Sequence, residues 1–233
     1  MNRSLPSLIP IDVAACDVSA ILNSQRIHHA FIGGYATGLI KGQSLMADLE
    51  VIVDCDPLEV CKLLVKFSRS RIVPYIDNHL FYRSAGVKIT IDVLQSGGDD
   101  HTPLPDIRTS PLCSIPPTDA LSHLMSAMPF LHPSVLILTN VSRWYKAKQF
   151  NGPLKTQAAA KYFENVIVIL KWLDARRILI NFAGFPQMSK DQHIATLRAL
   201  NADSQVVGPL LIATLIPEDY RLILGNDEIF LVE

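Results

Sequence analysis

The fold of this 233-residue chain is decided by residues 31–54, which read Phe31-Ile-Gly-Gly-Tyr-Ala-Thr-Gly-Leu-Ile-Lys-Gly-Gln-Ser-Leu-Met-Ala-Asp-Leu-Glu-Val-Ile-Val-Asp54. The pattern predicts a strand, a paired-glycine turn, a short helix and a second strand with acidic residues two positions apart. Because side chains two apart on a strand share one face, Asp48 and Glu50 can converge on one divalent cation. The bare backbone N–H groups of Gly33 and Gly34 offer a place for a phosphate. These are the parts that a nucleotide-handling site requires.

A third carboxylate, Asp92, stands in the apolar strand Ile89-Thr-Ile-Asp-Val. Burying a carboxylate among apolar residues is costly unless it is paired or binds a cation. Together with Asp48 and Glu50, it could hold Mg²⁺ through oxygen ligands while a triphosphate supplies others. The alternative is that all three lie at strand ends and face water. That alternative is favoured for Asp48 alone, but the full set, downstream of two glycines, favours a site.

The charge balance argues against a nucleic-acid partner. The chain has 21 basic and 22 acidic residues, a net charge of −1, and no long basic run. Binding to nucleic acid depends on many Lys and Arg contacts to phosphates. A small-molecule or protein partner is therefore expected.

The chain is apolar for its size. Charged residues make up 18%, against the roughly 25% that is usual in soluble domains, and 49% of residues are hydrophobic. Apolar surface left over would be covered by a second copy of the chain, a partner or a hydrophobic ligand. An ordinary protein with a large core explains the same composition equally well.

Neither a membrane nor a secretory role is expected. No segment approaches the roughly 20 apolar residues that cross a bilayer, and prolines and Asp12 interrupt the N-terminal segment where a secretory leader would be apolar. The four cysteines show no CxxC spacing. Reduced thiols and a cytoplasmic location are the expectation.

The predicted class is α/β (α+β), with a mixed sheet followed by a helical half. The strands are expected at residues 28–32, 49–53, 71–75, 79–83 and 87–94, and the first helices at 11–25, 35–40 and after Asp56-Pro57. Further helices are expected from Pro133, from Thr156 to about residue 174, at 189–200 and at 204–215. A proline-rich stretch between residues 97 and 117 divides an α/β domain, residues 1–110, from a helical domain, residues 111–233. His79, next to Asn78 in a turn, could face the cleft, but a solvated loop histidine is the expectation.

Residues 30–94 resemble the nucleotidyltransferase fold of the DNA polymerase β superfamily, whose signature is a GG or GS turn, a D-x-[DE] segment and a third Asp on a later strand. The chain is also similar to small fungal nucleotidyltransferase-like proteins. The shared motifs are Gly33-Gly-Tyr-Ala36, Ile89-Thr-Ile-Asp-Val-Leu94, His132-Pro133 and Arg143-Trp144. The resemblance covers most of the chain, but only about the first 95 residues carry a motif that implies chemistry. It implies nucleotide binding by Gly33, Gly34 and Ser44, and catalytic and metal-binding roles for Asp48, Glu50 and Asp92.

Three departures from the resembled pattern lie within seven residues. Ser44 stands where the pattern has Arg, Met46 where it has Thr, and Glu50 where Asp is common. Serine cannot replace the planar, always charged phosphate clamp of an arginine. The extra methylene of Glu50 displaces oxygens for which Mg²⁺ demands near-ideal octahedral geometry. The nucleotide site is therefore either weakened, lost or redirected.

Three functions remain open. The first is Mg²⁺-dependent transfer of a nucleoside monophosphate from a nucleoside triphosphate to a hydroxyl of a small molecule or protein. The second is metal-free acid/base or cyclisation chemistry on an apolar metabolite, with Asp92 or Glu50 moving a proton. The third is a non-catalytic protein that binds a partner through its helical half.

Overall fold

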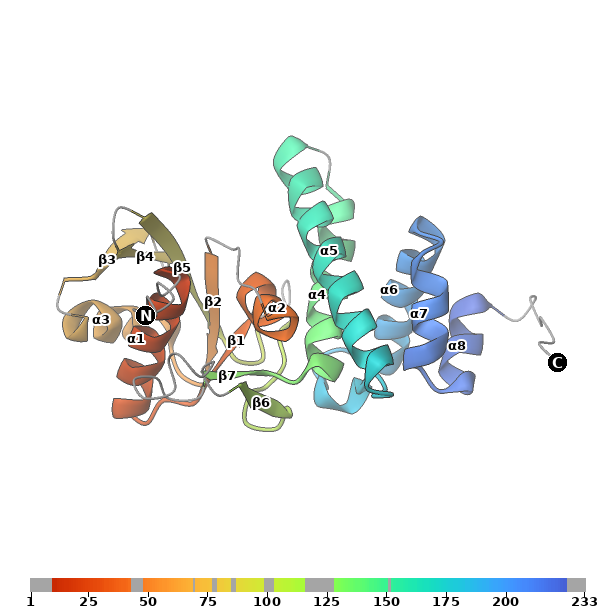
Figure 1. The fold of residues 1–233 in the computed structure, drawn as a ribbon, viewed down its shortest axis with the longest axis horizontal. Coiled ribbons are helices and arrows are strands. Elements are labelled where there is room, and N and C mark those ends of the chain that lie inside the picture. The colour runs from red at the N-terminus through yellow and green to blue at the C-terminus, as the bar shows by residue number, and fades with distance from the viewer. Residues whose placement is uncertain are drawn as a thin grey trace, which may run out of the picture. The chain divides into compact units, whose positions relative to one another are not determined.

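The computed structural model describes residues 10–42, 48–68, 70–76, 79–84, 87–98, 103–115, 128–150 and 152–225. Contacts divide the chain into two compact units, Met1–His132 and Pro133–Glu233 (Figure 1). Each unit is described by itself below.

Unit 1 is built on one mixed sheet of seven strands within the described residues. The strands are β1 (His29–Ile32), β2 (Asp48–Val53), β3 (Ile72–Ile76), β4 (His79–Ser84), β5 (Val87–Gln95), β6 (Leu112–Ile115) and β7 (Met128–Leu131), in the spatial order β3-β4-β5-β2-β1-β7-β6. β2 pairs with β5 and β1 pairs with β7 in parallel, and the other neighbours are antiparallel. The predicted mixed-sheet class is confirmed.

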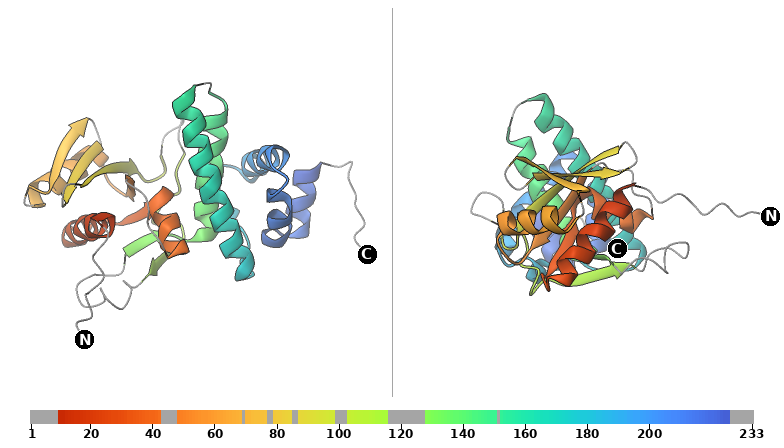
Figure 2. Two further views of the ribbon diagram at one scale, coloured as in Figure 1. Left: turned by 45° about the horizontal axis from the view of Figure 1, so that its top comes forward. Right: turned by 90° about the vertical axis from the view of Figure 1, so that its left-hand side faces the viewer.

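One face of the sheet is covered by helices. α1 (Pro10–Ser24) and α3 (Pro57–Phe67) pack against the strands and lie on one side of β3–β5 in both views of Figure 2. The residues of β5 alternate accordingly: Ile89, Ile91 and Val93 are buried, whereas Lys88, Thr90 and Asp92 are more exposed. The face that carries Lys88, Thr90 and Asp92 is called the polar face below.

Local sequence signals set the ends of the helices that flank the site. Asp56 caps α3 by accepting a hydrogen bond of 2.9 Å from the backbone N–H of Leu58, with Pro57 in the first turn, as predicted. α2 (Gly33–Lys41) begins directly after β1. Its N-cap residue, Ile32, makes no side-chain capping hydrogen bond. The first turn of α2 therefore keeps backbone N–H groups that no capping side chain occupies.

The sheet extends beyond the division that the sequence suggested. The predicted boundary fell between residues 97 and 117. β6 lies within this stretch, and β7 follows it and pairs with β1. The α/β unit thus continues to His132. Prolines 111, 116, 117 and 129 concealed these short strands from an analysis of periodicity.

Unit 2 is helical, as predicted. It contains α4 (Pro133–Lys148), α5 (Pro153–Ala175), a short 3₁₀ helix (Phe182–Gly184), α6 (Lys190–Asp203), α7 (Val207–Thr214) and α8 (Pro217–Leu224). Ser189 and Gln192 form a capping box at the start of α6. α5 begins at Pro153, before the predicted Thr156, and α8 was not predicted. No helix in the described ranges is long and apolar enough to cross a membrane.

A buried histidine ties the start of β1 to α1. His29 is 4% exposed, and its Nε2 lies 2.9 Å from Oγ of Ser19 while Nδ1 lies 3.1 Å from the carbonyl oxygen of Ile27. Desolvation by burial lowers the pKa of His29 below its ordinary value. The folded state thus disfavours the protonated imidazole.

We predict that the free energy of unfolding falls as the pH is lowered through the ordinary histidine pKa of about 6.5, since the unfolded chain then binds a proton that the folded chain resists. Chemical denaturation of the full chain at pH 7.5 and pH 5.5 measures this. His29→Gln should reduce the dependence, while His28→Gln, at the exposed neighbouring position, should preserve it. Equal pH dependence in all three proteins would contradict the assignment.

Candidate functional site

One row of the sheet brings three chemically active side chains together. In the register of the strands, His79 of β4 lies opposite Asp92 of β5, and Asp92 lies opposite Glu50 of β2. Directly opposed residues of neighbouring strands point to the same face. His79, Asp92 and Glu50 therefore all emerge on the polar face, in adjacent positions.

Asp48, the remaining carboxylate of the predicted set, lies on the same face of the sheet. Asp48 lies opposite Thr90 and two residues before Glu50, so its side chain leaves β2 on the side of Glu50. Burial raises the pKa of Asp92, the His79 hydrogen bond lowers it, and the charges of Glu50 and Asp48 raise it. The sequence thus predicted correctly which strands carry the three acids. The charges of Glu50 and Asp48 thus both disfavour ionisation of Asp92.

Glu50 lies against the first residue of α2. Gly33 has a φ of +63°, which favours glycine, and a Cβ added there would overlap with Oε2 and Cδ of Glu50. The positive φ favours glycine at this position, and any Cβ there would require the Glu50 carboxylate to turn away. In this arrangement Glu50 occupies the space beside Gly33 where the sequence analysis placed a phosphate.

His79 was assigned wrongly from the sequence. It is the first residue of β4, not a loop residue, and its Nδ1 lies 2.6 Å from Oδ1 of Asp92. The Asp92 side chain is 24% exposed and that of His79 is 45% exposed, so the pair is accessible from the polar face. The predicted strand at residues 79–83 already included this histidine. The register that sets it opposite Asp92 could not be deduced without the β4–β5 hairpin.

Of the other two residues predicted to bind nucleotide, Gly34 and Ser44, the structure describes only Gly34. Gly34 follows Gly33 in the first turn of α2 and is buried. Ser44 and the neighbouring departure Met46 lie outside the residues that the structure describes. The structure therefore gives the positions of the glycines and the acids of the predicted motif, and their roles stay predictions.

The set of donors suits a hard divalent cation, since carboxylate oxygens are the ligands that Mg²⁺ prefers. Asp48, Glu50 and Asp92 share one face, and the charges of Asp48 and Glu50 disfavour ionisation of Asp92, an effect that a bound cation would relieve. In the orientations seen here, no three His, Cys, Asp or Glu side chains among the described residues are gathered closely enough to hold a metal ion. Glu50 is directed to Gly33 and Asp92 to His79.

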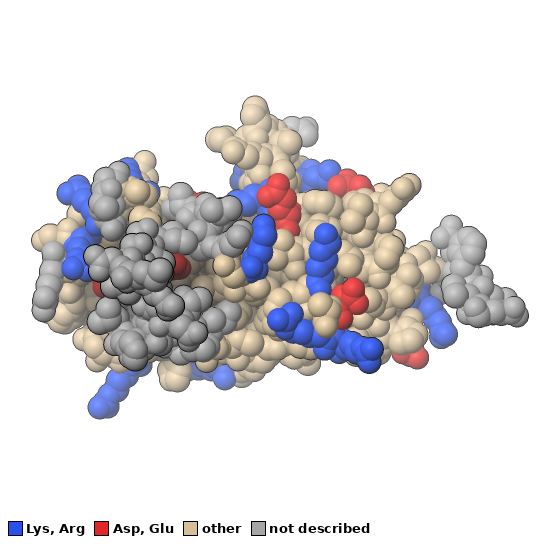
Figure 3. All heavy atoms as spheres, in the orientation of Figure 1, with Lys and Arg blue, Asp and Glu red and all other residues tan. Residues whose placement is uncertain are grey.

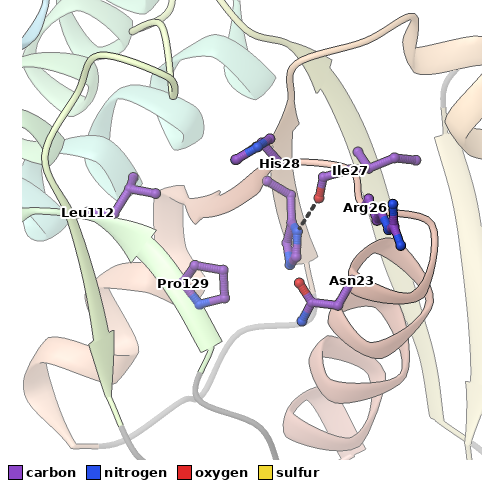
Figure 4. Close-up of a pocket in the computed structure, with 7 residues that line it drawn as sticks. Asn23, Arg26, Ile27, His28, Leu112 and Pro129 are labelled. Carbon is purple, nitrogen blue, oxygen red and sulfur yellow. Dashed lines mark hydrogen bonds between the residues drawn. The ribbon is translucent and has the colours of Figure 1, made fainter.

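A separate pocket lies at the opposite end of β1. It has a volume of about 310 Å³ and is lined by Asn23, Arg26, Ile27, His28, His29, Leu112 and Pro129. In Figure 4, Leu112 and Pro129 approach from one side, and Asn23 and Arg26 from the end of α1. The pocket includes none of the three carboxylates.

Comparison of folds connects this arrangement with known structures. No model of a known protein family matches the chain, and no curated protein matches it significantly. The crystal structure of an antigenic nucleotidyltransferase-like protein from Paracoccidioides brasiliensis superimposes with a TM-score of 0.65 at 16% sequence identity, over 88% of this chain and 94% of that one. The chain has a nucleotidyltransferase fold. At this identity, the likeness establishes the fold alone.

Two other solved structures were also found. The solution structure of the antibiotic-resistance factor ANT(2'')-Ia gives a TM-score of 0.39 at 13% identity, over 71% of this chain and 92% of that one. A tRNA nucleotidyltransferase, crystallised with a primer tRNA and an incoming ATP analogue, gives 0.30 at 14% identity, over 86% of this chain and 64% of that one. These scores are too low to support a detailed correspondence.

The contact between Gly33 and Glu50 can be measured by a double-mutant cycle. We predict that Gly33→Ala lowers the free energy of unfolding by about 1–2 kcal/mol through its positive φ alone, and by a further ~1 kcal/mol through overlap with Glu50. In a Glu50→Ala background the second contribution should vanish. Denaturant titration of the four proteins gives the coupling.

Gly42→Ala is the matched control, because Gly42 also has a positive φ, of +74°, and a Cβ there would meet nothing within 4 Å. Its cost should be independent of Glu50. Equal costs for Gly33→Ala with and without Glu50 would contradict the proposed contact.

Proposed function

We propose that the protein transfers a nucleoside monophosphate from a nucleoside triphosphate to a hydroxyl of a small molecule, in a reaction that requires Mg²⁺. The observation that supports it is the alignment of Asp48, Glu50 and Asp92 on one face of β2 and β5, beside the first turn of α2. The nucleotidyltransferase fold is consistent with this chemistry.

Gly33 and Gly34 would bind the phosphates. The first turn of α2 presents backbone N–H groups and the positive end of the helix dipole, and no side chain caps it at Ile32. Glu50 now lies against Gly33, so its carboxylate must turn away before a phosphate can approach the same backbone. Movement of Glu50 toward Asp48 and Asp92 would also bring the three acids closer together.

Asp92 is the residue best placed to accept the proton of the acceptor. The acceptor oxygen forms a bond to the α-phosphorus, the bond from this phosphorus to the β-phosphate oxygen breaks, and pyrophosphate leaves. Burial raises the pKa of Asp92 and makes it a stronger base. His79 holds the Asp92 carboxylate through its 2.6 Å hydrogen bond. Mg²⁺ bound by Asp48, Glu50 and Asp92 would neutralise the triphosphate and lower the pKa of the attacking hydroxyl.

A small acceptor fits the surface better than a nucleic acid. On the face drawn in Figure 3, Lys and Arg side chains are interspersed with Asp and Glu and form no continuous basic surface. The chain's net charge of −1 agrees with this distribution. Nucleic-acid binding without a basic surface would lack its main source of affinity.

A second candidate function is favoured by the His79–Asp92 pair. A partly buried carboxylate with a raised pKa, hydrogen-bonded to an imidazole, is suited to metal-free proton transfer. In this case Glu50 would stay against Gly33, and the substrate would be an apolar metabolite rather than a nucleotide.

Isothermal titration calorimetry with the four common nucleoside triphosphates, in the presence of Mg²⁺ or Mn²⁺, tests the proposal. We expect metal-dependent binding of at least one triphosphate. Asp48→Asn and Asp92→Asn should weaken it roughly tenfold or more, equivalent to about 1.4 kcal/mol per tenfold. Asp56→Asn, which removes a carboxylate but keeps a good helix cap, is the matched control and should bind normally.

Glu50→Asp sharpens the test. The shorter side chain withdraws the carboxylate from Gly33 while keeping an oxygen ligand, so nucleotide affinity should be preserved or increased. No heat with any triphosphate would refute the proposal. Turnover that survives EDTA but is lost in Asp92→Asn would establish the metal-free alternative instead, and absence of both would indicate a non-catalytic protein.

A further inference from the structure

A cluster of aromatic and basic side chains extends the polar face away from Glu50. Phe81 lies two residues after His79 on β4 and opposite Thr90, so it shares the face of His79 and Asp92. Tyr75 lies at an irregularity of β3, between Pro74 and Ile76, and its ring contacts that of Phe81, which places it on this face as well. The aromatic side chains therefore border the His79–Asp92 pair.

The cluster is organised around two rings and one ammonium group. The ring centroids of Tyr75 and Phe81 are 4.5 Å apart, with an interplanar angle of 48°. Nζ of Lys88 lies 3.3 Å from the centroid of Phe81 and 5.5 Å from that of Tyr75. The Tyr75 side chain is 59% exposed, so its ring remains available for contact with a ligand.

Two cations are paired across the strands at this place. Arg83 lies directly opposite Lys88, and like charges in this position destabilise a sheet. No ion pair joins either residue to an acidic side chain within the described ranges. An anion bound between the two would offset their repulsion.

The dimensions of the face relate the cations to Asp92. Residues two apart on a strand are separated by about 7 Å, and Lys88 leans over Phe81, which is one such step from His79. The ammonium group of Lys88 therefore lies about 7 Å from the row formed by His79 and Asp92. This separation matches the length of an aromatic ring with a substituent at each end.

We propose that Tyr75, Phe81, Arg83 and Lys88 form the acceptor subsite, and that the acceptor is a planar aromatic compound with a hydroxyl at one end and a carboxylate at the other. The aromatic ring stacks on Tyr75, which Phe81 supports. The carboxylate binds Lys88 and Arg83, while the hydroxyl reaches Asp92. The subsite specifies the acceptor of the proposed nucleotidyl transfer. The contact between the acceptor hydroxyl and Asp92 rests on that proposed function.

The test uses 4-hydroxybenzoate as a probe, with binding measured by saturation-transfer NMR on the full chain. We expect binding in the low millimolar range. Neutral 4-hydroxybenzamide and the non-aromatic 4-hydroxycyclohexanecarboxylate should bind about tenfold more weakly, because each lacks one of the two recognised features.

Variants locate the binding. Lys88→Met, Arg83→Gln and Tyr75→Leu should each weaken binding of the probe about tenfold. Lys66→Met is the matched control, since Lys66 also lies over an aromatic ring, that of Phe67, at 5.3 Å, but on α3. All four replaced side chains are exposed, and thermal unfolding confirms that the variants fold.

Absence of probe binding, equal binding of the neutral analogue, or equal binding by the Lys88 and Lys66 variants would overturn the inference. The last result would indicate that the cluster only protects β3, the edge strand of the sheet, from pairing with other chains. Calorimetry with Mg²⁺ and nucleotide keeps the two proposals distinct. Probe binding without nucleotide binding would retain the subsite and refute nucleotidyl transfer, and the reverse result would refute the subsite alone.

Discussion

The site depends on the parallel pairing of β2 with β5, which sets Glu50 directly opposite Asp92. A slip of one residue in this register would turn one set of carboxylates toward the helix-covered face, where apolar residues such as Val51 and Ile91 are buried. Leu49 and Val51, which flank Glu50 on β2, are buried, and so are Ile89, Ile91 and Val93 on β5, which makes that slip costly. The hydrophobic core therefore fixes the geometry of the acidic face, although none of its residues belongs to the site.

The concentration of negative charge is costly, and two neighbours compensate for it in this structure. Nδ1 of His79 is hydrogen-bonded to Oδ1 of Asp92, and Gly33 leaves room for the Glu50 carboxylate at the positive end of α2. Asp92 is thus directed to His79 and Glu50 to Gly33, and not to one another. In the function that we propose, a bound cation would reverse this arrangement by drawing the carboxylates toward one another.

Much of the fold was predictable because its signals are local. Asp56-Pro57 predicted the start of a helix, and the β-branched residues after Asp48 predicted a strand. The two-residue spacing of Asp48 and Glu50 predicted that they share a face. The pairing of His79 with Asp92 was not predictable, because it depends on which residues of β4 and β5 lie opposite each other. β6 and β7 were missed because they are short and their prolines favour a loop.

We propose that the polar face of β2 and β5 binds a divalent cation between its carboxylates. Paramagnetic broadening by Mn²⁺ in ¹H–¹⁵N correlation spectra of the full chain tests this most directly. We expect selective loss of the amide signals of Gly33, Glu50 and Asp92 at substoichiometric Mn²⁺, and no loss in Asp92→Asn. Retention of these signals, or broadening centred on the pocket around Asn23 and His28, would contradict it.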